Sequence, residues 1–259
     1  WKRITARVNN DIKLKKWLST SIDLGLKHSE TIEPAFSPSL RMRYAAPVYP
    51  AIFSDGRLAG GKDGENPYGK LVYGGNENSK GYQVSGKVSV DIKPIEDITI
   101  TGVFAPIYNF SKVKLFNKQV EYYTAWDDMV STDFMDETNT TDLRETRSDS
   151  YSITSQIYAN YNKSINKHNI SATLGYETFH YFYENLWASR GEYDIPYYPY
   201  LAAGPSTLMD NNGDAYENAY NSYIGRVMYN WGYKYYVQAN FRYDGSSRFH
   251  KDHRWAFFP

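Results

Sequence analysis

Apolar and polar side chains alternate along several stretches of the chain, most clearly near its end. One side of residues 235–244 carries apolar and aromatic side chains: Tyr235, Val237, Ala239, Phe241 and Tyr243. The other side is largely polar: Tyr236, Gln238, Asn240, Arg242 and Asp244. A period of two predicts a β-strand with two different faces. Large aromatic residues at both ends of the apolar face are typical of a transmembrane barrel strand, because Tyr and Trp lie well at the membrane–water interface.

The same alternation predicts eight strands in all. They cover residues 1–14, 18–27, 83–92, 98–104, 151–161, 168–180, 220–230 and 235–244. Short turns at 15–17, 93–97, 162–167 and 231–234 alternate with long segments at 28–82, 106–150 and 184–219. Short periplasmic turns and long external loops follow one another in this way in bacterial outer-membrane barrels. The pattern therefore predicts an all-β fold, an antiparallel transmembrane β-barrel segment of about eight strands.

Charged residues fall on the polar side of these strands, where we expect them to line the lumen of the barrel. They are Arg3, Arg7, Asp11, Lys13, Lys87, Asp91, Glu177 and Arg242.

Composition narrows the function. The chain has 259 residues, 26 tyrosines, six tryptophans, no cysteine and a formal net charge of zero. The zero charge gives no electrostatic reason to expect a nucleic-acid partner. No run approaches the roughly 18 apolar residues of a membrane-spanning helix. The sequence contains no catalytic motif, so we expect neither an enzyme nor a cofactor.

The end of the chain carries a long and unusual motif. Its residues are Arg242, Asp244, Gly245, Ser246, Ser247, Arg248, Phe249, Arg254, Trp255, Phe258 and Pro259. They resemble the R-x-D-G-S-S-R-F…R-W-x-x-F-P signature of the SusC/RagA family, which are TonB-dependent outer-membrane transporters of the Bacteroidetes type. Residues 7–19 and 168–177 resemble further, shorter motifs of this family.

The resemblance implies that residues 1–259 are part of a larger receptor barrel, without its plug domain and its C-terminal strands. The chain also begins within a strand pattern and has no signal peptide, so we expect a piece of a larger protein. Family members lie in the outer membrane of Gram-negative bacteria, in contact with its lipid. They import glycans (oligosaccharides) or peptides with a SusD/RagB-like surface lipoprotein, driven by TonB through an N-terminal region that this chain lacks.

Aromatic residues in the third long segment are the best candidates for contacts with a ligand. They are Tyr183, Trp187, Tyr193, Tyr197, Tyr198, Tyr200 and Tyr216, with Tyr220 beside them. Aromatic faces stack on sugars and fill apolar pockets. Residues 210–214 offer oxygen ligands at alternate positions but lack the glycine and the distant glutamate of a calcium loop. We therefore predict a turn there and no metal site.

Two other classes of protein remain open at this stage. A small outer-membrane barrel with a structural or adhesive role would be complete in 259 residues. A soluble secreted carbohydrate-binding β-sandwich would pair its apolar faces with each other.

Overall fold

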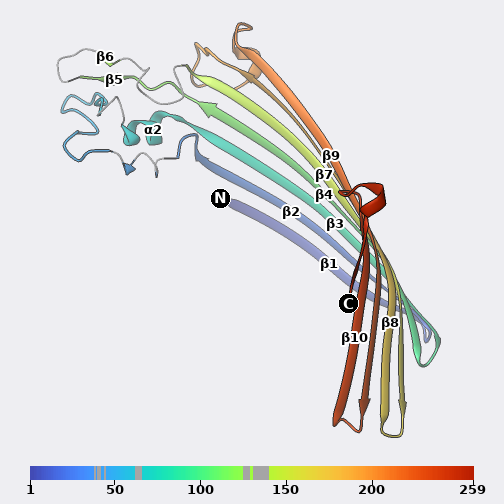
Figure 1. The fold of residues 1–259 in the computed structure, drawn as a ribbon. Coiled ribbons are helices and arrows are strands. Elements are labelled where there is room, and N and C mark those ends of the chain that lie inside the picture. The colour runs from blue at the N-terminus through green and yellow to red at the C-terminus, as the bar shows by residue number, and fades with distance from the viewer. Residues whose placement is uncertain (38, 40–41, 44, 62–65, 125–128, 131–139) are drawn as a thin grey trace.

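A computed structural model describes residues 1–37, 39, 42–43, 45–61, 66–124, 129–130 and 140–259 of the chain. Nine strands form one antiparallel sheet in which neighbours follow chain order (Figure 1). They are β1 (Lys2–Lys15), β2 (Leu18–Pro34), β3 (Gly75–Ile95), β4 (Ile98–Asn117), β7 (Asp142–Ile165), β8 (His168–Arg190), β9 (Met209–Trp231), β10 (Tyr235–Ser246) and β11 (Trp255–Phe258). The predicted antiparallel all-β architecture is confirmed, and β11 is a strand that the alternation did not predict.

The remaining elements are small and lie in the connections. They are α2 (Pro67–Tyr73), β5 (Tyr122–Tyr123), β6 (Met129–Val130), η3 (Leu201–Ala203) and η4 (Lys251–His253). Helix α2 begins at Asn66, whose side-chain oxygen accepts a hydrogen bond of 3.2 Å from the backbone N–H of Gly69. None of the helices in the described ranges is long and apolar enough to cross a membrane.

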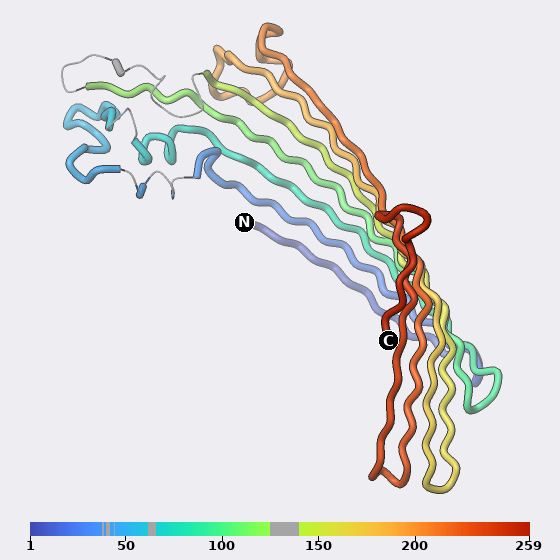
Figure 2. Tube along the Cα trace, viewed as in Figure 1, coloured from blue at the N-terminus to red at the C-terminus, as the bar shows by residue number. Residues whose placement is uncertain are grey.

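Short turns and long connections lie at opposite ends of the sheet. The short turns join β1 to β2, β3 to β4, β7 to β8 and β9 to β10, and Figure 2 shows them away from the end that carries α2 and β5. At the β9–β10 turn, Gly232 has a φ of +56°, a conformation that glycine adopts without steric cost. The long connections cover residues 35–74, 118–141 and 191–208. The predicted alternation of short and long connections is therefore confirmed.

The predicted bounds of the long connections were wrong, because the strands continue beyond the alternating stretches. Segment 28–82 shortens to 35–74, 106–150 to 118–141, and 184–219 to 191–208. In the added parts, polar residues occupy both faces. Glu30 on β2, for example, faces Lys80 on β3. The backbone ladder continues there without the apolar face that makes a strand visible in the sequence.

The sheet is a single layer with two different faces. Its apolar face carries Ile4, Leu24, Val84, Phe104, Ile157, Leu174, Val227 and Val237, and its polar face carries Arg7, Asp23, Lys87, Asp91, Glu177 and Arg242. In the described ranges, no protein layer covers the body of the apolar face, since Ile4 is 68% and Leu174 63% exposed. The accessible surface is 17558 Å², against about 11,700 Å² for a compact monomer of this mass.

This arrangement excludes the β-sandwich, which needs two sheets packed face to face. The described strands form one nine-stranded sheet and one of two short strands. The large sheet is also open, with β1 at one edge and β11 at the other, so it is not a small closed barrel. Among the described residues, buried apolar clusters occur at the end of the long connections, around Phe116 and Leu143 and around Tyr122.

The signature residues form a corner at which the chain turns back from β10 into β11. Gly245 lies directly opposite Trp255, and the Trp255 ring stacks on Tyr243 at 4.9 Å between centroids. The Ser247 N–H donates to the carbonyl of Ala219 on β9 at 2.9 Å, and the Ser247 hydroxyl accepts from the Ala219 N–H at 2.9 Å. The sequence of the corner is thus explained largely by its folding.

Gly245→Ala tests this explanation. A Cβ at Gly245 would meet the Trp255 ring at 2.6 Å, whereas a Cβ at Gly102 in β4 would meet nothing within 4 Å. We expect Gly245→Ala to lower the stability of the full-length protein by about 1–3 kcal/mol, because the indole must move. Gly102→Ala is the matched control and should leave stability nearly unchanged. Equal denaturation midpoints in detergent for the two variants would contradict the role given to Gly245.

Candidate functional site

The polar face of the sheet holds an extended hydrogen-bonded network. The guanidinium of Arg7 contacts the carboxylate of Asp23 on the neighbouring strand, with Nε 3.0 Å from Oδ1. Thr101 on β4 donates to Asp91 on β3 at 2.6 Å. All eight charged residues predicted to share one side lie on this face, which confirms that part of the sequence analysis.

An aromatic cluster lies on the same face where β8 and β9 run toward the long connections. We call it the aromatic ladder; it comprises Phe179, Tyr181, Tyr183, Trp187, Tyr216 and Tyr220. Phe179 stacks on Tyr220 at 4.8 Å with 16° between the rings, and Tyr183 lies 5.2 Å from Tyr216. Alternate residues of a strand share a face, so the ladder continues the row that begins at Glu177.

Trp187 marks the far end of the ladder. The guanidinium of Arg144 on β7 lies 3.6 Å from the centroid of the Trp187 ring, a cation–π contact. The contact fixes one face of the indole and leaves Trp187 on the polar face of the sheet. Arg144 therefore adds a positive charge and hydrogen-bond donors to a surface made mostly of aromatic rings.

The ladder contains three of the seven aromatic residues expected to contact a ligand. Tyr183, Trp187 and Tyr216 lie in strands, with Tyr220 beside them, whereas segment 184–219 had been predicted to be a loop. Phe179 and Tyr181 were missed. Phe179 lies within the predicted strand 168–180, on the same side as Glu177, and extending the period of two to the end of β8 would have added Tyr181.

The other four aromatic residues lie in the connection 191–208, and two of them are fastened to the opposite side of the sheet. Tyr193 packs edge-on against Phe116 at 5.8 Å and donates its hydroxyl to the carbonyl of Tyr200 at 3.1 Å. Phe116 belongs to the apolar face. Burial raises the pKa of Tyr193 above its usual range, so the phenol stays a neutral donor.

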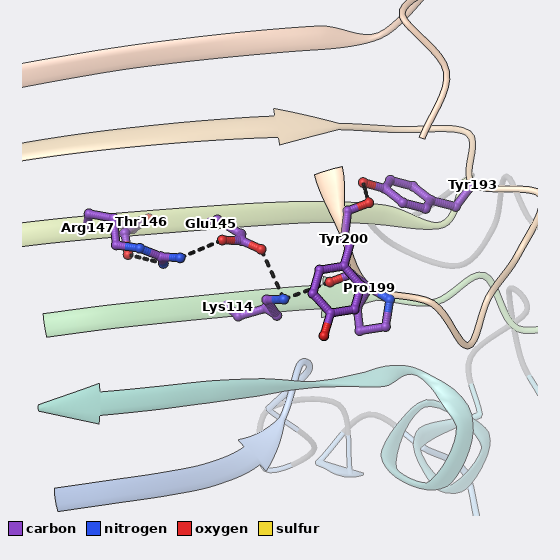
Figure 3. Close-up of polar contacts among 7 residues, drawn as sticks. All are labelled: Lys114, Glu145, Thr146, Arg147, Tyr193, Pro199 and Tyr200. Atoms are coloured by element: carbon purple, nitrogen blue, oxygen red, sulfur yellow. Dashed lines mark hydrogen bonds and ion pairs between the residues drawn. The ribbon is translucent and has the colours of Figure 1, made fainter. Parts of the chain in front are cut away.

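The Tyr200 ring is held by Lys114 (Figure 3). The Lys114 ammonium lies 4.3 Å from the ring centroid and donates to the carbonyl of Pro199 at 2.7 Å. Tyr198 lies 4.7 Å from Tyr200, and Tyr197 is 80% exposed. The structure therefore does not bring these residues together with the ladder.

Two signature arginines border the ladder. Arg248 donates from Nε to the side chain of Asn218 at 2.9 Å, and Asn218 lies between two ladder residues on β9. Arg242 donates to Ser222 at 3.2 Å and to the carboxylate of Asp244 at 3.2 Å. The other signature residues, Ser246, Phe249, Arg254, Phe258 and Pro259, lie in or beside the β10–β11 corner.

Residues 210–214 lie within β9, so the turn predicted there was wrong. Asp210, Asn212 and Asp214 alternate with Asn211 and Gly213, as strand residues do. In the described part of the chain, no group of three His, Cys, Asp or Glu side chains is placed to hold a metal ion. The groups that the polar face offers are aromatic rings, hydrogen-bond donors and carboxylates, which can stack and form hydrogen bonds.

Two curated relatives match part of the chain. It is 31% identical over 109 residues to the TonB-dependent receptor SusC of Bacteroides thetaiotaomicron, a match that covers 42% of this chain and 10% of that receptor. It is 33% identical over 106 residues to the TonB-dependent receptor P3 of Formosa agariphila, covering 40% of this chain and 11% of that receptor. No family model matches the chain.

Solved structures with a similar fold include two states of one importer. A chain of the RagAB peptide importer in the open-open state matches with a TM-score of 0.77 and 21% identity, covering 99% of this chain and 28% of that one. The closed-closed state matches with a TM-score of 0.76 and 20% identity, covering 98% and 29%. These structures support the fold. Together with the signature corner, the curated relatives support the resemblance of this chain to the SusC/RagA family of TonB-dependent receptors, although the chain spans only about a tenth of each relative's length.

Proposed function

We propose that these strands form part of the wall of an outer-membrane importer, with the apolar face of the sheet against lipid. The observation that carries the proposal is the open apolar face, bounded by aromatic rows. A large exposed apolar surface requires a partner, and a row of Tyr and Trp at each border is typical of a membrane-spanning barrel.

The first aromatic row lies on the apolar face toward the long connections. Tyr108 and Tyr151 lie 5.7 Å apart, Tyr151 stacks on Phe182 at 5.6 Å, and Tyr223 lies 6.0 Å from Trp255. We call this the loop-side row. The second row lies near the short turns and includes Tyr161, Tyr229, Trp231 and Tyr235.

The spacing of the two rows fits a bilayer. Tyr151 and Tyr161 lie ten residues apart on β7. Ten residues span about 33 Å along a strand, which is about 25 Å across the membrane at a tilt of 40°. Beyond the loop-side row, the same face of β7 turns from apolar to charged at Asp149, Arg147 and Glu145. This change supports a strand that leaves the lipid and continues outside it.

The relatives support import as the activity of the whole receptor, driven by TonB through a region outside this chain. We propose that a plug domain and further barrel strands also lie outside it, since the chain covers 28% of the RagAB chain that it resembles. We place the long connections outside the cell and the short turns in the periplasm.

The aromatic ladder is proposed to contact the imported substrate, a glycan or a peptide. Its flat rings and the neighbouring amides and guanidinium groups suit both ligands. The similar solved structures are described as a peptide importer, whereas the ladder itself favours neither class. Tyr193, Tyr197, Tyr198 and Tyr200 are no longer proposed as substrate contacts, because their connection is fastened to the other side of the sheet.

A SusD/RagB-like surface lipoprotein is the proposed partner of the long connections. The resemblance of the signature motif to the SusC/RagA family and the fold shared with the RagAB peptide importer support such a partner. Exposed apolar side chains on α2 offer a contact surface: Tyr68, Leu71, Val72 and Tyr73. Exposed apolar surface at the outer end of the sheet is expected where a lid docks.

Ile157→Arg tests the lipid contact. Ile157 is 55% exposed on the apolar face, between the two aromatic rows of β7. An arginine near the bilayer midplane costs a barrel about 2–4 kcal/mol. We expect Ile157→Arg to reduce the heat-modifiable folded band of the full-length receptor in membranes.

Gln156→Arg is the matched control. Gln156 neighbours Ile157 but lies on the polar face, where its side chain contacts Glu177. An arginine there gains a carboxylate partner and should be tolerated. If both variants fold equally well, the apolar face does not meet lipid.

Trp187→Ala tests the ladder as a binding surface. Loss of the indole should weaken substrate binding about tenfold, or about 1.4 kcal/mol. Tyr197→Ala, in the connection 191–208, should leave binding unchanged because Tyr197 is 80% exposed and lies off the ladder. The measurement is calorimetric titration of the receptor with defined oligosaccharides and with tryptic peptides. If Trp187→Ala binds the ligand as tightly as wild type does, Trp187 does not contact the substrate.

A further inference from the structure

Three cations lie side by side on the outer wall, immediately beyond the loop-side row. Lys80 on β3 faces Lys112 on β4, and Lys112 in turn faces Arg147 on β7. We call these three residues the basic row. Residues directly opposite in an antiparallel pair have Cβ atoms about 5 Å apart, so their side chains leave the sheet together.

Carboxylates neutralise only part of this charge. Glu30 lies 3.1 Å from the ammonium of Lys80, which holds the pKa of Glu30 below its usual range. The Glu145 carboxylate forms ion pairs with two cations, the Lys114 ammonium at 3.0 Å and the Arg147 guanidinium at 2.7 Å (Figure 3). The cluster therefore has four cations and two carboxylates.

Lys112 is the exposed centre of the row. Among the residues that the structure describes, no carboxylate pairs with it, and both of its cross-strand neighbours are cations. Like charges directly opposite in a sheet destabilise it. An anion bound over Lys112 would offset that repulsion and would accept hydrogen bonds from all three side chains.

The position of the row indicates which anion it meets. Lys80 and Lys112 lie two residues beyond Tyr82 and Phe110, on the same strands and the same face. Two residues span about 7 Å along a strand, so the cations lie just outside the aromatic border of the lipid. Lipid headgroup phosphates lie at this depth, and basic clusters on membrane proteins bind them.

Acidic residues limit the site on one side. Asp149 lies opposite Phe110, and Glu184 lies opposite Asp149 on β8. These carboxylates disfavour an anion over β7 and β8 at that level, which confines the site to the wall formed by β3, β4 and the edge of β7.

We propose that the basic row binds the phosphate groups of an outer-leaflet lipid. The inference rests on the proposed lipid contact of the apolar face. It adds a specific lipid site on the outside of the wall, separate from the aromatic ladder on the polar face. The bound lipid would fasten β3, β4 and β7 together at the membrane surface.

The test uses the full-length receptor in detergent, with diphosphoryl lipid A as the probe and native mass spectrometry to count bound lipid. Lys112→Gln should weaken binding about fivefold, as expected for one cation at a charged lipid surface. Lys87→Gln, with the same charge change on the polar face of β3, should bind like wild type. Lys112→Arg should keep binding because it keeps the charge. Lipid A without phosphates should bind equally to wild type and to Lys112→Gln, because the proposed contact of Lys112 is with the phosphate groups.

Several outcomes would overturn the site. If Lys112→Gln and Lys87→Gln bind lipid A equally, the binding reflects a non-specific electrostatic attraction and not a site at the basic row. Displacement of lipid A by inorganic phosphate alone would assign the row to a free anion. The heat-modifiable band reports folding, and Lys80→Gln takes the place of Lys112→Gln if that variant does not fold. A receptor absent from the membrane fraction would instead contradict the proposed function.

Discussion

The structure depends on one constraint. A single-layer sheet must form its backbone hydrogen bonds between strands, and each of its two faces must suit a different environment. Backbone N–H and C=O groups pair across eight strand contacts, in register over most of their length. In the part of the chain that the structure describes, no second layer of protein covers either face of the sheet body. Side-chain alternation therefore decides which residues lie on which face, because a shift of one residue would exchange the apolar-face and polar-face residues of a whole strand.

The two faces explain how one chain can hold both the proposed membrane wall and the proposed binding surface. Aromatic residues occur on both, with different roles. Tyr151 and Tyr223 on the apolar face belong to the loop-side row, at the proposed border of the lipid, whereas Tyr183 and Tyr216 belong to the ladder on the polar face. Only the strand register separates the two sets, since their residue types are the same. The signature corner joins them, because Trp255 lies on one face and Arg248 reaches the other.

The sequence could predict the strands wherever one face is apolar, as from Ile170 to Tyr176, and it could predict the short turns between them. It could not predict the ends of the strands beyond the alternating apolar stretches. There, Glu30 faces Lys80 and Lys114 faces Glu145, so both faces are polar and the pattern disappears. The signature motif resembles that of the SusC/RagA family, but β11 within it is too short for a period of two to stand out.

The candidate site was partly predictable for a related reason. Aromatic content alone pointed to residues 183–216, without distinguishing strand from loop. The packing of Tyr193 against Phe116 joins residues 77 positions apart, a contact that no local pattern contains. The ladder, in contrast, is local, and its residues follow from extending one strand and its register with β9.

The most direct test of the two-faced wall is a spin-label scan along β8. This chain contains no cysteine, so single cysteines can be placed at each position from Ile170 to Tyr176 in the full-length receptor. Collision of the label with oxygen, which concentrates in lipid, is compared with collision with a water-soluble nickel chelate. Oxygen contact should dominate at positions 170, 172, 174 and 176, and nickel contact at 171, 173 and 175. Equal contact at successive positions, or the reverse alternation, would contradict the membrane wall.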